Sequence, residues 1–298
     1  MFKNFAEVET YLEENKICKT VAVAGAQDDI ALPAVIRATK KGYIKPILVG
    51  REEEITALLT RLGEKPADYE IVNEKREMKT ASTAIKLVKE GKADFPMKGL
   101  MQTASFLMAV QNPLGGIATP DQLLNEVTVF EYPDQDRMIV LGDCAVNIAP
   151  DLEQKKKITA NLIKVAQAYQ CDEVKVAAVS VIEKPNPTIP SSMDAAELAK
   201  EDWGEGVIVE GPFGLDNALD AEAAKHKGIE SKVAGNADVL VMPDIHGGNL
   251  LHKSIHFFGR YKFSSGLVGA DTPIIMNSRT DDEDAKYYSI LSAILLSL

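Results

Sequence analysis

The chain is poor in cysteine and has no long apolar run. Its three cysteines, Cys18, Cys144 and Cys171, are far apart and form no CxxC pair. This spacing gives no support to a disulfide framework or a zinc knuckle and is typical of a reducing compartment. No apolar run is long enough to span a bilayer, and residues 1–18 lack the apolar stretch of a signal peptide. We therefore expect a cytoplasmic protein that has no membrane partner.

Basic charge is also scarce. Lys and Arg number 33 against 44 Asp and Glu, so the formal net charge is −11. An acidic protein repels nucleic-acid phosphates, so we expect no nucleic-acid partner. An anionic small molecule could bind only where a few cations or N–H donors gather. With 46% hydrophobic residues, the chain can form one large α/β unit or two lobes.

Common cofactor and metal motifs are missing as well. After the first predicted strand the chain reads Ala24-Gly25-Ala26-Gln27-Asp28, not GxGxxG, and no Walker A sequence occurs. His252 and His256 lie four residues apart but have no HExxH frame, so we interpret them as helix-surface histidines and predict no metal site. Cys144 has no neighbouring histidine, and a buried core cysteine is the simpler interpretation.

Short β-rich runs alternate with helical patterns along most of the chain. This alternation predicts an α/β fold of mainly parallel sheets with helices on both faces. Helices are predicted at 79–91, 152–170 and 284–298. The predicted strands cover 20–26, 46–50, 69–73, 94–99, 127–132, 138–143, 174–183, 207–211, 239–244 and 273–278.

The alternation fails near residues 112–126, where Gly and Pro gather. Strands 127–132 and 138–143 then follow each other across the turn at Pro133 and Asp134. This pattern predicts a hairpin and a change of lobe.

Two turns after predicted strands carry candidate anion ligands, because helix N-termini at the carboxyl ends of parallel strands present free N–H groups. One turn contains Asp244, Gly248 and Asn249 and opens a helix with Lys253; a simple Pro-Asp turn with a solvated lysine explains it equally well. The other contains Ser278 and Arg279. Ser278 with Asp281 matches a capping box, whereas a cation such as Arg279 at a helix start indicates a bound anion.

Taken together and in order, these turns resemble the phosphate acetyl/butyryltransferase family over nearly the whole chain. The resemblance is closest to the phosphate butyryltransferase branch at residues 148–152 and 226–229. The matching strings are Met97-Lys98-Gly99, Asp143-Cys144-Ala145-Val146-Asn147, Gly211-Pro212 with Asp216-Asn217-Ala218, Pro243-Asp244 with Gly248-Asn249 and Lys253, and Ser278-Arg279.

The resemblance implies a two-lobed, three-layer α/β/α fold like that of isocitrate and isopropylmalate dehydrogenases. Residues 1–122 and 267–298 would form one lobe and residues 123–266 the other, with the active site in the cleft between them. It also implies a homodimer. The expected activity is reversible transfer of a short- or branched-chain acyl group between coenzyme A (CoA) and inorganic phosphate, with CoA a substrate and no cofactor or metal.

Site roles follow from the same resemblance. Ser278 would hydrogen-bond the CoA thiol, Arg279 would neutralise the phosphate, and Asp284 would accept the thiol proton. The CoA- and phosphate-binding positions would be Lys98, Gly99, Thr103, Asn147, Asp244, Gly248, Asn249 and Lys253.

Three positions depart from the family pattern. Relatives place a histidine and an arginine where this chain has Gln102 and Met108, and the acetyltransferase-like branch has its acid where this chain has Ala285. A methionine cannot bind phosphate, so Lys98, Lys253, Arg260 or Lys262 would have to compensate, or anion specificity or activity has changed. Asp281, Asp282 and Glu283 are alternative bases.

Two other classes of function stay open on the sequence. One is a catalytically silent paralogue that keeps an acyl-CoA or anion site, which the base-poor segment around Met108 favours. The other is an oxidoreductase of similar architecture, which would need a divalent metal and a nicotinamide cofactor. The lack of clustered acidic residues at strand ends disfavours the oxidoreductase.

Overall fold

The computed structural model describes all residues, 1–298, and its chain divides into two compact units. Unit 1 contains residues 1–4 and 123–263, and unit 2 contains residues 5–122 and 264–298. The division inferred from the sequence was 123–266 for one lobe and 1–122 with 267–298 for the other.

The sheet of unit 2 is parallel, with strand order β3-β2-β1-β4. Its strands are β1 (Lys19–Ala24), β2 (Ile44–Gly50), β3 (Glu70–Asn73) and β4 (Phe95–Lys98). Its helices are α1 (Phe5–Glu14), α2 (Ala31–Lys40), α3 (Glu52–Arg61), α4 (Glu77–Lys89), α5 (Thr103–Val110) and α11 (Glu283–Leu296), with the short 3-10 helix η1 (Pro66–Asp68).

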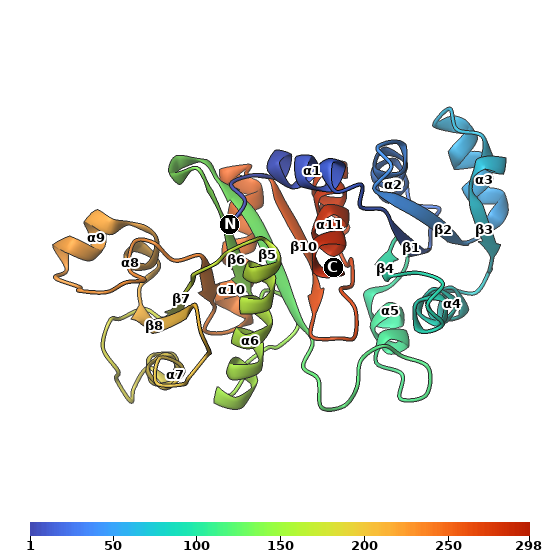
Figure 1. Ribbon diagram of the computed structural model, residues 1–298. Coiled ribbons are helices and arrows are strands. Elements are labelled where there is room, and N and C mark those ends of the chain that lie inside the picture. Colours follow the sequence, from blue (N-terminus) through green and yellow to red (C-terminus); the bar gives the residue numbers. More distant parts are fainter. The chain divides into compact units, whose positions relative to one another are not determined.

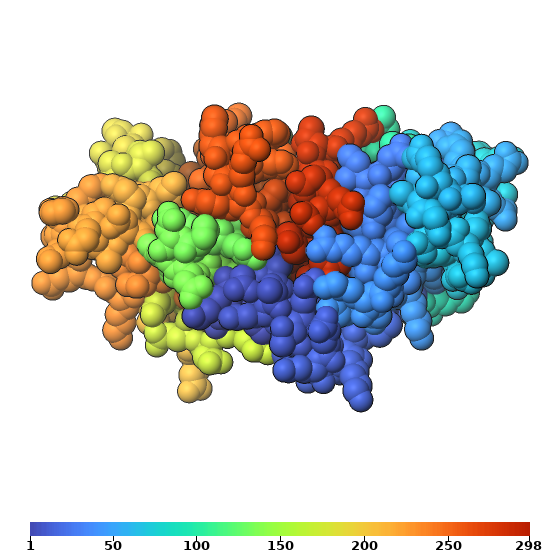
Figure 2. All heavy atoms as spheres, turned by 90° about the horizontal axis from the view of Figure 1, so that it is seen from above, coloured from blue at the N-terminus to red at the C-terminus, as the bar shows by residue number.

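Helices cover both faces of this sheet (Figure 1). Helices α1, α2 and α11 pack together on one face, and α4 and α5 pack on the other. In the space-filling view, α2 and α3 form much of the outer surface of unit 2 (Figure 2, mid and light blue). Because both faces are covered, β1 and β2 are almost continuously buried, as their apolar sequences predict.

The C-terminal segment of unit 2 extends this sheet in a way that the sequence did not predict. The expected strand 273–278 is not a regular strand, since only Ile274 and Ile275 form isolated bridges, to Leu267 and Met97. Pro273 has no N–H to donate, and residues 277–281 turn back on themselves. Strand β10 (Phe263–Val268) was not predicted, because its sequence FSSGLV is short and partly polar.

The second sheet has six strands, and the five that lie wholly in unit 1 follow the order β5-β6-β9-β7-β8. β5 (Asn125–Tyr132) and β6 (Arg137–Gly142) form the predicted antiparallel hairpin around η2 (Pro133–Gln135), and the other pairs are parallel. The remaining strands are β7 (Val174–Val179), β8 (Val207–Phe213) and β9 (Val239–Val241). The helices are α6 (Leu152–Ala168), α7 (Pro190–Leu198), α8 (Leu215–Leu219), α9 (Ala221–His226) and α10 (Ile245–Ser254), followed by the π-helical turn η3 (Ile255–Gly259).

The predicted α/β class with mainly parallel sheets is confirmed, but several strand ends were placed too late. β9 ends at Val241, because Pro243 cannot continue the hydrogen-bond ladder and Asp244 caps the next helix. β7 ends at Val179, after which the chain reaches the surface, with Val181 76% exposed. The three predicted helices are confirmed with ends shifted by one or two residues.

Asp143 organises the turn that follows β6. Its buried carboxylate accepts five hydrogen bonds, from the backbone N–H groups of Glu126, Ala145, Val146 and Asn147 and from the Asn147 side chain. Hydrogen bonds to a carboxylate are stronger than neutral ones, and buried donors left without a partner are costly. Asp143 therefore holds the β6 turn against the start of β5.

We expect Asp143→Ala to lower the free energy of unfolding of unit 1 by about 3 kcal/mol or more, because several N–H groups lose a buried acceptor. Urea unfolding measures this change. Glu230→Ala, which removes an exposed carboxylate from the same unit, is the control and should have almost no effect. Equal stability of the two variants would contradict the assigned role of Asp143.

Candidate functional site

The strongest candidate site in unit 2 is a group of charged side chains that we call the cation cluster: Lys98, Lys286 and Arg279, with Asp28 and Asp281. Lys98 ends β4 and Lys286 lies on the first turn of α11, and these two lysines are only 5% and 4% exposed. Burial of a lysine ammonium group is rare, since charge is poorly solvated inside a protein. Two such groups in one unit indicate a purpose other than stability.

The electrostatics of the cluster show that its members interact. Burial lowers the pKa of Lys98, and repulsion from Lys286 and Arg279 lowers it further, whereas Asp28 and Asp281 oppose this change. Burial likewise lowers the pKa of Lys286, against attraction by Asp28, Asp281 and Asp282. The two ammonium groups thus share two carboxylates in a poorly solvated place, where an added anion would be attracted strongly.

Hydrogen bonds place the Ser278 turn within this cluster. The Lys286 Nζ donates to the Ser278 carbonyl oxygen at 3.3 Å, and the Ser278 N–H donates to the Asp281 carboxylate at 2.9 Å. Asp281 is 1% exposed, whereas Arg279 is exposed to solvent. The Ser278 hydroxyl lies 3.0 Å from the Thr280 hydroxyl.

The predicted helix cap at Ser278 is wrong. Helix α11 begins at Glu283, and its N-cap is Asp282, whose carboxylate accepts the Ala285 N–H. Asp281 instead closes the turn that precedes the helix. Arg279 therefore lies in that turn, before the helix start rather than at it, and its side chain is held by no part of the helix.

Asp284, the predicted base, has a partner that the sequence did not reveal. Its carboxylate forms an ion pair with Arg37 of α2, with Nη1 and Oδ1 2.6 Å apart. The Arg37 guanidinium lies over the Tyr287 ring, 3.7 Å from the ring centroid. This contact fixes one oxygen of Asp284, while its side chain stays 63% exposed.

The loop that contains Gly99 crosses the loop that contains Gly25 at close range. A Cβ on Gly99 would lie 2.4 Å from the Gly25 carbonyl oxygen, and one on Gly25 would lie 2.7 Å from the Leu100 carbonyl oxygen. Gly25 also has φ +74°, a conformation that favours glycine. This crossing holds Lys98 beside the end of β1. Thr103 is exposed at the first position of α5, where backbone N–H groups are free to meet an anion.

In unit 1 the predicted residues contact one another around the end of β6. Asp244 caps α10 by accepting the Gly247 N–H, and the Asn249 side chain donates to the Cys144 carbonyl oxygen at 3.1 Å. A Cβ on Gly248 would lie 2.1 Å from the Asp143 carbonyl oxygen, so this glycine is needed for packing. Lys253 lies further along α10 and is partly buried.

Asn147 and His252 also have structural partners. The Asn147 side-chain amide donates to the Leu124 carbonyl oxygen and to Asp143. His252 is buried, 2.8 Å from the Thr128 hydroxyl, so its interpretation as a helix-surface histidine is wrong. His252 shares the buried face of α10 with Gly248. Burial raises the pKa of Cys144 well above its usual value, as expected for a core cysteine rather than a nucleophile.

Sequence reasoning missed Asp28, Arg37 and Lys286. Asp28 was noted only as part of a failed fingerprint, although it accepts N–H groups at the start of α2. Lys286 lies in a predicted apolar helix, and a lysine interrupting the apolar stripe of α11 was the one available signal. No helix of the chain combines the length and the apolar character needed to cross a membrane.

Comparisons with known proteins identify the family to which this chain belongs. Residues 51–294 match the family described as phosphate acetyl/butaryl transferase. The chain is 41% identical to the phosphate butyryltransferase of Clostridium acetobutylicum over 100% of this chain and 99% of that protein. It is 38% identical to the phosphate acetyltransferase of Thermotoga maritima, over 93% and 95% of the two chains.

Among solved structures, a branched-chain phosphotransacylase from Enterococcus faecalis superposes with a TM-score of 0.82 and 30% identity. The match covers 94% of this chain and 99% of that one. The resemblance seen in the sequence is therefore confirmed over nearly the whole chain, which belongs to the phosphate acetyl/butaryl transferase family.

Proposed function

We propose that this protein reversibly transfers a short- or branched-chain acyl group between CoA and inorganic phosphate. The observation that carries this proposal is the cation cluster. Its buried Lys98 interacts electrostatically with Lys286 and Arg279, and Lys286 donates a hydrogen bond to the Ser278 carbonyl oxygen. A doubly charged phosphate would replace the hydration that Lys98 and Lys286 have lost. The names of the family and of its relatives support the same reaction.

In the proposed reaction the CoA thiolate attacks the carbonyl carbon of an acyl phosphate. A sulfur–carbon bond forms, the carbon–oxygen bond to phosphate breaks, and phosphate leaves with the electron pair. The Ser278 hydroxyl hydrogen-bonds the thiol, and Arg279 with the buried lysines stabilises charge on the departing phosphate. Asp284 accepts the thiol proton, and neither a metal nor another cofactor takes part.

Further predicted residues serve binding. We assign Gly99 and Thr103 of unit 2 to the phosphate, through backbone approach and the N-terminus of α5. On the family resemblance we also assign five residues of unit 1 to substrate binding: Asn147, Asp244, Gly248, Asn249 and Lys253. All of these except Lys253 also make the structural contacts described above.

The Met108 departure is compatible with this assignment. Met108 is 62% exposed on the surface of α5. The buried cations of unit 2 are Lys98 and Lys286, and the substitution at position 108 removes neither of them. Of the other proposed compensating residues, Lys262 lies 3.8 Å from the Glu131 carboxylate. A catalytically silent paralogue is not favoured, because the chain matches a phosphate butyryltransferase over its full length.

Assembly and location remain proposals. We propose a homodimer in the cytoplasm. The C-terminal helix α11 does not supply a dimer interface on its own, because eleven of its residues are buried within unit 2. Sedimentation of the purified protein measures the oligomeric state.

Release of free CoA from acetyl-, butyryl- or isobutyryl-CoA, with and without phosphate, tests the proposed function. We expect phosphate-dependent release, and Arg279→Ala should lower kcat/KM by about 10²–10³-fold with no loss of stability, since Arg279 is exposed. Arg61→Ala, an exposed arginine of α3, is the control and should match the wild type. No phosphate-dependent release with any of the three thioesters would refute the assignment.

The role of Asp284 is tested with a neighbouring carboxylate as control. Asp284→Asn should lower kcat by about 10²-fold or more through loss of the base, whereas Glu283→Gln, an exposed acid one position earlier, should leave kcat unchanged. Initial rates at saturating CoA and acyl phosphate give the comparison. If both variants keep wild-type kcat, the proton goes to another group.

A further inference from the structure

The Ser278 turn follows a set of buried polar side chains that the proposed reaction does not use. We call this set the polar seam; its members are Ser264 and Ser265 of β10, Asn277, and Ser289 and Ser292 of α11. All five are at most 9% exposed. Burial of polar groups costs free energy unless they are paired, and apolar side chains of similar size would fill the same space without that cost. The polar seam therefore indicates a role other than packing.

Ser289 is the centre of the polar seam. Its hydroxyl donates to the Ala285 carbonyl oxygen at 2.8 Å, one turn earlier in α11. The same hydroxyl oxygen accepts the Ser265 N–H and the Asn277 side-chain amide, both at 2.9 Å. A serine hydroxyl has one proton and two lone pairs, so this hydroxyl is fully used. It joins α11, β10 and the segment before Ser278 at one atom.

Asn277 directly precedes Ser278 and is held at two points. Its amide nitrogen donates to the Ser289 hydroxyl at 2.9 Å and to the Ser265 hydroxyl at 3.1 Å. Because the Ser289 proton is already taken, the group that faces this hydroxyl must be a donor, as the amide nitrogen is. Two hydrogen bonds from one planar amide fix both the place and the orientation of the side chain.

The backbone around Asn277 lies outside the sheet. The last hydrogen bonds between backbone groups are those of Ile275, which contacts Pro96 and Lys98. The next one lies within the turn, from the Asp281 N–H to the Ser278 carbonyl oxygen at 3.2 Å. The Asn277 side chain therefore anchors the stretch between the end of the sheet pairing and the turn.

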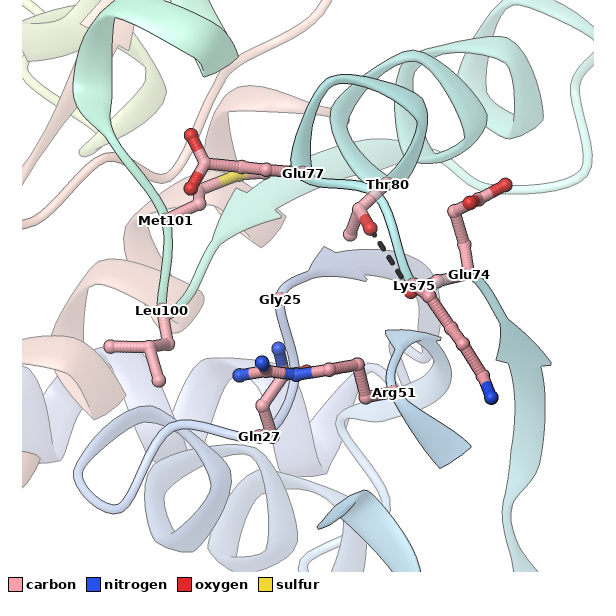
Figure 3. Close-up of a pocket in the computed structure, with 9 residues that line it drawn as sticks. All are labelled: Gly25, Gln27, Arg51, Glu74, Lys75, Glu77, Thr80, Leu100 and Met101. Atoms are coloured by element: carbon pink, nitrogen blue, oxygen red, sulfur yellow. Dashed lines mark hydrogen bonds between the residues drawn. The ribbon is translucent and has the colours of Figure 1, made fainter. Parts of the chain in front are cut away.

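Support for the turn and access to the cation cluster come from different parts of unit 2. Gln27 and Leu100 lie in the loops that also contain Asp28 and Lys98, and they line a pocket that opens to solvent (Figure 3). The residues of the polar seam do not line this pocket, and all of them are buried. The polar seam can therefore affect a reaction only through the residues that it holds.

We propose that Asn277 is a positioning residue for the Ser278 turn. Held at two points, it fixes where the Ser278 hydroxyl and the Arg279 guanidinium meet the reacting groups. The inference rests on the proposed function, which gives Ser278 and Arg279 their roles. Displacement of a reacting group by about 1 Å can lower a rate about 10²-fold, which explains why paired polar groups stand where apolar side chains would also pack.

Steady-state kinetics of Asn277→Leu and Ser289→Ala test the proposal. Asn277→Leu keeps the side-chain volume and removes the amide. We expect each variant to lower kcat about tenfold or more and to change KM for CoA less than about threefold, because the loss falls on the transition state. Ser292→Ala is the control. Its hydroxyl donates to the Ser264 hydroxyl at 2.6 Å, so this variant breaks a hydrogen bond of the same seam and should lower Tm without changing kcat.

A variant with both substitutions, Asn277→Leu and Ser289→Ala, separates positioning from a general loss of packing. Residues that act through one hydrogen bond are not additive, so the double variant should have the kcat of Asn277→Leu alone. Losses of kcat that multiply would overturn the proposal. So would a wild-type kcat in both single variants with a Tm lowered as in Ser292→Ala, which would make the polar seam structural. If Asn277→Leu does not fold, the comparison of Ser289→Ala with Ser292→Ala decides.

Amide hydrogen exchange separates this inference from the proposed function. The Ser278 N–H donates to the Asp281 carboxylate, and the Asp281 N–H donates to the Ser278 carbonyl oxygen. Both N–H groups should exchange about tenfold faster in Asn277→Leu and at the wild-type rate in Ser292→Ala. If the wild type releases no CoA with phosphate, the proposed function fails, whereas faster exchange still supports Asn277 as the anchor of the turn. Unchanged exchange in Asn277→Leu would overturn the inference whatever the activity.

Discussion

The burial of two lysine ammonium groups within one unit is the constraint on which the proposed chemistry depends. Lys98 and Lys286 are held by different elements, the end of β4 and the first turn of α11, and both give up most of their hydration. Asp28 and Asp281 offset part of that cost. The neighbouring loops hold these charges in place. The close crossing of the Gly25 and Gly99 loops positions Lys98, and the Ser278 carbonyl oxygen accepts a hydrogen bond from Lys286.

The parts of this arrangement that could be predicted from sequence are those with a local signature. The buried parallel strands were visible because both sheet faces are covered and their sequences are continuously apolar. Lys98, Ser278 and Arg279 were found because they occupy family-like strings at strand ends. Their grouping at one edge of unit 2 follows from the parallel direction of the strands.

The rest depends on contacts that sequence spacing does not encode. Lys286 interrupts an apolar helix, but the sequence does not show that it is buried beside Lys98. Asp28 and Arg37 interact with Lys286 and Asp284, which lie 258 and 247 residues away along the chain. The bridges at Ile274 and Ile275 replace the expected strand, because the chain there must also form the turn closed by Asp281. In unit 1, Asn147, Gly248 and Asn249 hold the β6 turn and α10 together. The family motif therefore identified residues that have structural contacts, and the sequence match alone did not reveal these contacts.

A single variant tests directly whether the buried lysines are kept for phosphate binding and not for stability. The measurement is the dissociation constant for inorganic phosphate and the Tm of Lys286→Met, compared with the wild type. We predict that phosphate binding is weakened about tenfold or more and that the Tm is unchanged or higher, since a buried charge has been removed. Unchanged phosphate affinity together with a lower Tm would contradict it and would make Lys286 a structural residue.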